Sequence, residues 1–224
     1  SSRIGPRLRE LDVSLSSYGT AIPRVHGRMR VAGSIIWATE LQEHSDVLSP
    51  GGNQPALTTY SYTANLAVAL SSRPIQSIGR IWADGKLLRG ASGDLKVGGI
   101  LRFYTGHDSQ PVDPLIAAHE GEERCPAFRD LAYVVFEALE LSDYGNRIPA
   151  LTFEVIGDES LSLKAVLNES LGDLDVPDDI TTLDGLTIDE SLGASLATLA
   201  PVIPVSLDAG RDIIVAHFND TPTA

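Results

Sequence analysis

The chain has 224 residues, of which 43% are hydrophobic, which is enough for one large or two small globular domains with their own cores. It lacks both a run of about 18 apolar residues and a basic start followed by an apolar stretch, so neither a membrane-spanning helix nor a signal peptide is expected. The single cysteine, Cys125, cannot form an intramolecular disulfide, and we expect a buried thiol. The start at Ser1 and the loose Thr-Pro-Thr-Ala end suggest a piece of a longer polypeptide, from the cytoplasm or from a soluble particle.

The net charge of -13 is spread unevenly. Residues 1–156 hold 15 Lys and Arg against 17 Asp and Glu, a net charge of -2, whereas residues 157–224 hold 2 against 13, a net charge of -11. Near Gly157 the strand-like patterns also give way to partly helical spacing. We therefore predict a β-rich domain over residues 1–156 and a small acidic α/β domain over residues 157–224.

The stretch Ser16–Glu40, SSYGTAIPRVHGRMRVAGSIIWATE, alternates with the period of a strand. One side carries apolar residues around Gly33: Met29, Val31, Ile35 and Trp37. The other side carries smaller or basic residues: Arg28, Arg30, Ala32 and Ser34. Because glycine allows sharp turns and close backbone approach, we predict a bent antiparallel pair over residues 18–37, with Pro23 at an edge or a bulge.

The clearest strand runs from Thr58 to Ser71, where even positions are mostly large and apolar and odd positions are small or polar. At about 3.3 Å per residue it would span roughly 45 Å, so we expect it to bend or to run past the edge of its sheet. Further strands are predicted at Leu11–Ser17, Thr20–Val25, Ser77–Ala83, Gly99–Tyr104, Leu131–Ala138 and Leu151–Ile156.

Two local signals complete the first segment. Asp84-Gly85 predicts a hairpin turn, and Asp113, Pro114 and Gly121 predict the N-cap, first position and end of one short helix. The second segment is predicted to hold two helices, Leu161–Leu171 closed by Gly172 and Ser191–Ala200 ended by Pro201. It is also predicted to hold a short strand at Leu186–Ile188 and a hairpin of Val202–Leu207 with Arg211–Phe218. The predicted fold is thus mainly β, an antiparallel barrel or sandwich with one short helix, followed by a small α/β domain.

The chain does not have the residue spacing of known catalytic, nucleotide-binding or metal-binding motifs. The approaches to a nucleophile elbow at Ser170 and Ser191 lack its first glycine, and neither a phosphate-binding loop nor a histidine pair at metal spacing is present. The acidic run that begins at Asp173 lacks the glycine and the glutamate of a calcium loop. We expect no enzyme, cofactor or metal; a hydrolase fragment using Ser170 or Ser191 is an alternative.

Six of the first thirty residues are arginines, although the whole chain is acidic. Tight phosphate binding needs a broad basic face with little competing acid, so we do not expect nucleic-acid binding. Arg24, Arg28 and Arg30 are instead expected to form ion pairs at an interface with another domain or subunit. Further along, Asp143-Tyr144-Gly145-Asn146-Arg147-Ile148-Pro149 predicts a structural turn in which Gly145 or Asn146 has a positive φ.

Three compound motifs over residues 5–156 also carry a resemblance: YGxxIPxxxGxxRxxGxxIW (residues 18–37), IWADGK (81–86) and DYGNRIPxxxFEV (143–155). With GPRLREL, TTYSYTANLAVAL and LRFYTGHDSQPVDPLIAAHEG, they resemble the phage tail protein family that includes the baseplate hub, or megatron, of gene transfer agents and the tail-tip hubs of long-tailed phages. Residues 161–218 resemble the next hub domain more weakly.

The resemblance implies a structural protein that forms a homotrimeric ring at the distal end of a tail tube, with barrel domains that copy the tube fold. The implied partners are distal tail or tail-tube proteins and the tape-measure protein, and DNA passes through the lumen without specific binding. The protein would be found in a virion or phage-like tail, and in the host cytoplasm during assembly. A glycan-binding β-module, using Trp37 or Trp82, is a second alternative.

A hub that lets DNA through should repel phosphate within about a Debye length of 8 Å. We therefore expect part of an acidic cluster to face the channel: Asp173, Asp175, Asp178, Asp179, Asp184, Asp189 and Glu190. The competing interpretation is that these carboxylates point outward and only keep the domain soluble.

Overall fold

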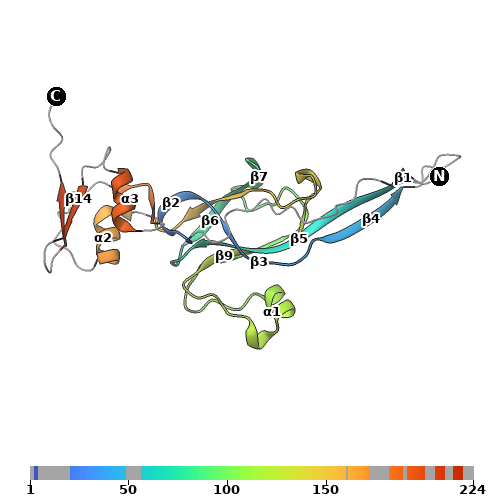
Figure 1. The fold of residues 1–224 in the computed structure, drawn as a ribbon, viewed down its shortest axis with the longest axis horizontal. Helices are drawn as coiled ribbons and strands as arrows, with labels where there is room; N and C mark the ends of the chain where they lie inside the picture. Colours follow the sequence, from blue (N-terminus) through green and yellow to red (C-terminus); the bar gives the residue numbers. More distant parts are fainter. Residues whose placement is uncertain are drawn as a thin grey trace, which may run out of the picture.

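The structure is a computed structural model that describes residues 3–4, 21–48, 57–159, 161–171, 182–188, 191–199, 205–209 and 214–218. Its centre is a sandwich of two sheets (Figure 1). The first sheet contains β1 (Arg3–Ile4), β3 (Ser34–Ala38), β4 (Gln42–Leu48), β5 (Leu57–Ser71), β8 (Ile100–Tyr104) and β9 (Ala132–Glu140). The second contains β2 (Arg24–Ala32), β6 (Ser77–Ala83), β7 (Lys86–Arg89), β10 (Leu151–Ile156) and β13 (Gly185–Ile188).

The remaining elements are short. They are the strand pairs β11 (Leu161–Ser162) with β12 (Thr182–Leu183) and β14 (Val205–Ala209) with β15 (Ile214–Phe218), the helices α1 (Pro114–Glu120), α2 (Leu163–Leu171) and α3 (Leu192–Leu199), and the 3-10 turns η1 (Glu122–Arg124) and η2 (Ser142–Tyr144). Among the described strands all pairings are antiparallel except that of β1 with β5. The predicted mainly antiparallel β fold is confirmed.

The long strand β5 is confirmed, and it runs past its sheet as expected. Its pairing with β9 begins only at Thr63, whereas its first half pairs with β4 from Leu57 onward. We call β4 together with residues 57–62 the arm, and Figure 1 shows it projecting from the sandwich. The alternation of β5 holds in the arm but stops near Asn65, after which every residue is buried.

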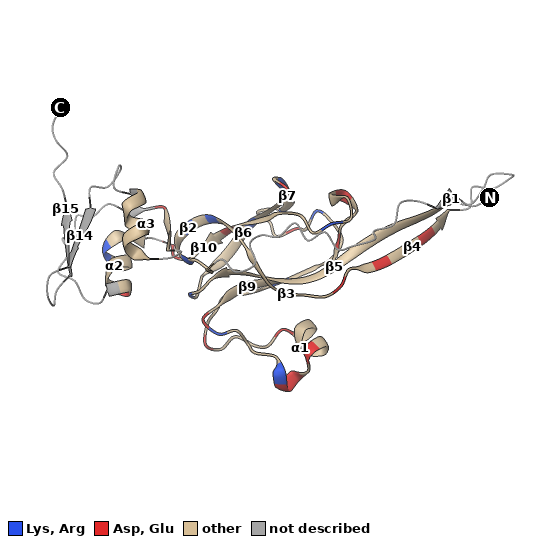
Figure 2. Cartoon of the chain, viewed as in Figure 1, with Lys and Arg blue, Asp and Glu red and all other residues tan. Residues whose placement is uncertain are grey.

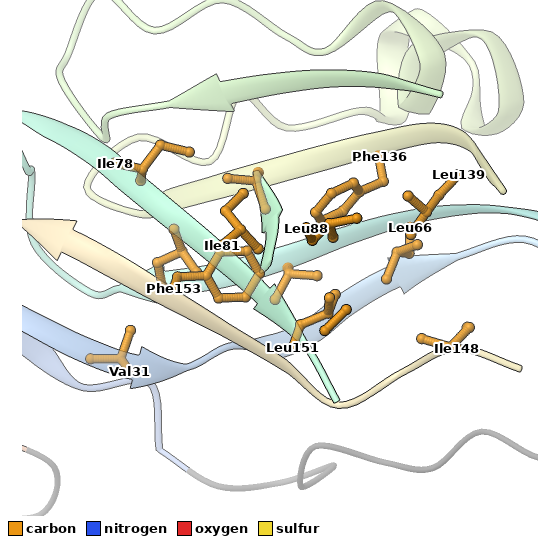
Figure 3. Close-up of a cluster of buried hydrophobic side chains, with 14 of the residues drawn as sticks. Val31, Leu66, Ile78, Ile81, Leu88, Phe136, Leu139, Ile148, Leu151 and Phe153 are labelled. Carbon is orange, nitrogen blue, oxygen red and sulfur yellow. The ribbon is translucent and has the colours of Figure 1, made fainter. Parts of the chain in front are cut away.

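The second half of β5 is buried on both faces because two clusters cover it. Leu66 and Val68 face the core between the sheets, where Phe136 of β9 and Phe153 of β10 also pack (Figure 3). The remaining labelled members of this core are Val31, Ile78, Ile81, Leu88, Leu139, Ile148 and Leu151. On the opposite face Ala67 belongs to a smaller cluster under α1, formed with Ile116, Cys125, Tyr133 and Val135. Cys125 is buried there, as predicted.

The predicted helix and hairpin turn are confirmed. Asp113 caps α1, since its carboxylate accepts hydrogen bonds from the backbone N–H groups of Leu115 and Ile116, and the helix ends at Gly121 with φ 91°. Asp84 and Gly85 both have positive φ, 50° and 79°, which a two-residue turn between β6 and β7 requires. The strands at Ser77–Ala83 and Leu151–Ile156 have the predicted bounds.

The predicted antiparallel pair within residues 18–37 is wrong. β2 pairs with β10 and β13 of one sheet, whereas β3 pairs with β5 of the other, so the chain changes sheet at Gly33. A Cβ on Gly33 would lie 2.1 Å from Val68 Cγ1 and 2.8 Å from Phe153 Cε2, so core side chains fill the space that glycine leaves.

Two details of the same stretch also differ from the prediction. A register shift between Ile35 and Trp37 turns Trp37 onto the α1 side, whereas Ile35 packs against the core between the sheets. β2 begins at Arg24, after Pro23, rather than at Thr20, because proline cannot donate to the ladder. The strand predicted at Leu11–Ser17 lies outside the described residues.

The second segment joins the sandwich through its own strand. β13 confirms the strand predicted at Leu186–Ile188 and extends the second sheet by pairing with the start of β2. A small cluster of Leu161, Val166, Leu186 and Ile188 packs α2 behind it. α2 and α3 confirm the predicted helices within two residues at their starts, and β14 with β15 forms the predicted hairpin at shifted positions. The predicted helix ends at Gly172 and Pro201 lie outside the described residues.

Candidate assembly surfaces

The arm is the most exposed regular structure in the described part of the chain. All seven residues of β4 are exposed, and three large apolar side chains stand in water: Val47 is 62% exposed, Leu48 58% and Leu57 38%. Leu48 lies directly opposite Leu57, so the two form one apolar patch near the end of the arm. Soluble proteins rarely leave such a patch uncovered on a projecting element, which marks it as a contact surface.

The charge of the arm has one sign. Residues 42–48 and 57–62 contain Glu43 and Asp46 but no lysine or arginine. Figure 2 shows these acidic positions on β4, away from the basic residues of the sandwich. Glu43 accepts a hydrogen bond from the Tyr62 hydroxyl at 2.7 Å, whereas Asp46 shares the face of Leu48 because residues two apart on a strand point the same way.

A basic surface lies on the outer side of the second sheet. We call it the arginine face and define it by Arg28, Arg30, Arg80, Trp82 and Leu87. The Arg30 guanidinium lies over the Trp82 ring at 3.9 Å from its centroid and donates to Thr152 Oγ1. Its arginines and Leu87 are exposed, with Leu87 at 41%.

One carboxylate holds this face in order. Glu154 accepts hydrogen bonds from the Arg28 guanidinium at 2.7 Å and from the backbone N–H of Arg80 at 3.0 Å, and these lower its pKa. A Cβ on Gly79 would lie 2.4 Å from Glu154 Oε2, so glycine makes room for that carboxylate. Arg28, Arg30 and Arg80 thus share this side of the sheet with one carboxylate, which leaves the face positive.

A second charged site joins the sandwich to α2. Arg73, which follows β5, pairs with Asp158 at 3.0 Å and with Glu169 of α2 at 3.2 Å. Arg24 pairs with Glu169 at 2.7 Å, and the backbone N–H of Gly27 donates to Asp158. Burial alone raises the pKa of Asp158, but the hydrogen bonds from Gly27 and Arg73 outweigh it and lower the pKa overall.

His26 lies buried within this junction. It is 1% exposed, and its Nδ1 is 3.8 Å from Glu169, while its Nε2 has no hydrogen-bond partner in the described part of the chain. Desolvation by burial lowers the pKa of His26, and the nearby Arg73 charge lowers it further, against the opposing influence of Glu169 and Asp158. The imidazole is therefore held neutral near pH 7.

Asp113 fixes the α1 segment to the first sheet. It is fully buried and accepts hydrogen bonds from the Arg102 guanidinium at 2.8 Å and from the Tyr104 hydroxyl at 2.7 Å, while Arg102 also pairs with Glu137. Burial alone raises the pKa of Asp113, but the bonds from Arg102 and Tyr104 outweigh it and lower the pKa overall. A fully satisfied buried carboxylate of this kind orients structure and leaves no reactive group.

The predicted turn lies at the base of the arm. Gly145 and Asn146 both have positive φ, 67° and 58°, and the backbone N–H of Asn146 donates to Leu141. Leu141 in turn donates to the carbonyl of Tyr62, the last residue of β5 in the arm. Arg147 pairs with Asp84 of the β6–β7 turn at 2.8 Å, so two of the sequence motifs meet here.

The alternative sites look structural where the chain is described. Ser191 Oγ accepts a hydrogen bond from the backbone N–H of Ala194 at the start of α3, and Ser170 Oγ is buried without a hydrogen-bond partner in this part of the chain. The Trp82 face is covered by Arg30, and Trp37 donates its indole N–H to Glu120 at 2.9 Å. Both indoles are thus engaged in contacts within the described part of the chain.

Sequence patterns located some of these residues and missed others. Arg24, Arg28 and Arg30 have the partners given above, of which only Glu169 belongs to the second segment. The strand β4, Arg73 and Glu169 were missed; the β4 sequence QEHSDVL has no apolar alternation that would predict a strand. Of the acidic cluster, Asp184 is exposed and its carbonyl accepts from Arg28, whereas the others lie outside the described residues.

Within the described residues, groups of three or more His, Cys, Asp or Glu side chains that could hold a metal ion are not found. None of the helices described is long and apolar enough to cross a membrane. The described chain is thus a mainly antiparallel β protein whose prominent surfaces are an exposed arm, an arginine face and a charged junction.

Comparison with solved structures relates this fold to one chain from the virion of a native gene transfer agent (GTA) particle. The sequences are 28% identical and the TM-score is 0.65. The match covers 90% of this chain and 53% of that chain, so this protein spans about half the length of the virion chain. Models of known protein families and curated protein sequences give no match.

Proposed function

We propose that this chain is a structural component of a phage tail or GTA tail tip, where it forms the hub ring at the distal end of the tail tube. One observation carries the proposal: the similarity to a chain of a GTA virion extends over 90% of the protein in both sequence and fold. The similarity supports a structural virion component and favours this role over that of an enzyme.

The motifs supply the finer part of the proposal. The three compound motifs resemble hub proteins, and two of them meet at the base of the arm through the Arg147–Asp84 pair. In the proposed particle three copies form a ring that contacts the tail tube or distal tail proteins on one side and the tape-measure protein within. Two turns joined by an ion pair would hold a projecting arm in one orientation, as a ring requires.

The arginines are assigned different roles in this proposal. Arg24 joins the two predicted domains, on either side of Gly157, through Glu169. Arg28 and Arg30, which project from the outer side of the second sheet, belong to a contact with a neighbouring subunit. The division of the chain into two domains remains part of the proposal.

The lumen of the proposed ring lets DNA pass and does not bind it. The purified chain is therefore expected to give no salt-sensitive complex with duplex DNA near 150 mM ionic strength, measured by fluorescence anisotropy. A micromolar complex that weakens steeply with added salt would show instead that the arginines hold nucleic acid.

The role is tested on particles rather than on the isolated chain. Particles from a producing strain with an epitope tag on this chain are purified and labelled with gold-conjugated antibody, and the label is located by electron microscopy. Gold at the free end of the tail is expected, and a strain lacking the gene should yield heads without complete tails. Label on the head, or complete tails in the deletion strain, would contradict the proposal.

A further inference from the structure

We propose that the arm of one copy docks onto the arginine face of a second copy, so that identical chains join head to tail. The inference rests on the proposed function, because only an assembly of identical copies places the two surfaces together. The inference gives a partner to each of the two surfaces, both of which expose apolar side chains in the single chain.

The arm has little cover within the described part of its own chain, since β1 pairs with it only at Leu57 and Thr58 and all of β4 is exposed. β9 leaves β5 at Thr63, and the seven residues of β4 extend the arm by about 24 Å at roughly 3.4 Å per residue. From residue 59 to residue 62 the arm has only two strands among the described residues. Its end carries the Leu48–Leu57 patch. An isolated two-stranded hairpin is marginally stable in water, so a stable arm of this length needs a surface to lie on.

The arginine face has the matching chemistry. Leu87 is an exposed leucine beside Trp82, its paired residue on β6, and it can receive the leucines of the arm. Arg80 is exposed, and the nearby Glu154 carboxylate is already bound to the Arg28 guanidinium and to a backbone N–H. An incoming Asp46 therefore meets unbalanced positive charge, and opposite signs guide the two surfaces together.

The two surfaces cannot meet within one chain. Figure 1 places β4 at one end of the sandwich and β7, which carries Leu87, near its middle on the other sheet. Because the docking surfaces differ, the contact is heterologous: each copy gives its arm to the next and receives one from the previous copy. Such contacts form a closed ring when the rotation between copies closes.

Cysteine cross-linking tests the contact directly. The native Cys125 is buried, so the double variant Leu48→Cys/Leu87→Cys forms disulfides at the new sites when the full chain is oxidised mildly. Dimers and trimers are expected on a non-reducing gel, with most of the chain cross-linked. The control Leu48→Cys/Ala118→Cys places the second thiol at an exposed position on α1 and should give at least about tenfold less product. Equal yields from both variants would overturn the proposal.

A charge exchange distinguishes specific docking from chance contact. Asp46→Arg alone and Arg80→Asp alone should each weaken self-association about tenfold by analytical ultracentrifugation, whereas the two combined should restore it to within about threefold. A chain that stays monomeric at 100 μM in its natural form, or single variants that associate normally, would overturn the inference. In that case gold label at the tail tip would still uphold the proposed function; cross-linked trimers with label elsewhere would uphold only the inference.

Discussion

The two halves of β5 show how one strand serves two purposes. Residues 57–62 lie in the arm, pair with β4 and are mostly exposed or half-buried, whereas residues 63–71 lie between β9 and β3 and become buried on both faces. The first half reads LTTYSY and the second TANLAVALS. Polar side chains suit a surface that meets water or a partner, and small apolar ones suit a strand covered on both sides.

The length of β5 alone does not decide where this strand passes from the surface to the core. The passage occurs where Leu141 donates to the carbonyl of Tyr62, at the turn that contains Gly145 and Asn146. Beyond this point the α1 segment covers one face and the second sheet covers the other. The same hydrogen-bonded strand therefore contributes stability in one half and an accessible surface in the other.

Shortening one leucine in each half of β5 should show the largest difference between the core half and the arm half. Leu66 is fully buried among the core residues, so Leu66→Ala should lower the free energy of unfolding by about 3 kcal/mol through lost burial and a cavity. Leu57→Ala, in the arm, should cost less than about 0.5 kcal/mol. Urea denaturation followed by circular dichroism measures both. Equal losses would mean that the arm belongs to the folded core.

A methyl group added at Gly33, which packs against the buried half of β5, should have the next largest effect on stability. Gly33→Ala places a Cβ against Val68 and Phe153 and should destabilise the protein by about 2 kcal/mol through overpacking. Removing the colliding methyl groups with Val68→Ala in the same chain should recover part of that loss relative to the sum of the single variants. Additive losses in the double-mutant cycle would show that the collision is relieved elsewhere.

Acid should destabilise the junction between the sandwich and α2, where His26 is buried. Because the folded protein lowers the pKa of His26 below its ordinary value of about 6.5, the unfolded chain binds the extra proton first. Stability is therefore full above pH 6.5 and falls as the pH drops towards the folded-state pKa. Thermal unfolding between pH 7.5 and 5 should show this fall.

Two substitutions assign that pH dependence. His26→Gln should flatten the slope between pH 6.5 and 5, whereas His107→Gln, at an exposed position, should leave it unchanged. Asp158 of the junction titrates at lower pH, since its pKa is itself lowered. A slope that survives in His26→Gln would place its origin elsewhere.

The smallest effect is expected at the turn between the two halves. Gly145 has φ 67° and open space around it, so Gly145→Val acts only through backbone strain. That strain should lower the free energy of unfolding by about 1 kcal/mol and lower the melting temperature accordingly. Gly145→Asn should be tolerated, because asparagine adopts the left-handed region readily. If both variants have the same melting temperature as the natural chain, the turn does not constrain the base of the arm.

Sequence patterns were reliable where the rule was local. The caps of α1, the Asp84-Gly85 turn and the bounds of β6 and β10 follow from single residues and short alternations, and all were found. The change of sheet at Gly33 could not be predicted, because it depends on Val68 and Phe153, which are distant in sequence. β4 was missed for a related reason, since it has no buried side to impose a pattern.

The pairing of β13 with β2 has a practical consequence for anyone who cuts this chain. A protein ending at Ile156 would keep both sheets of the sandwich but would open the edge of β2 from Arg24 to Gly27, where four residues now pair with residues 185–188. It would also remove Glu169 from beside the buried His26. Open strand edges recruit strands from other molecules, so such a fragment would form irregular aggregates more readily than the longer chain.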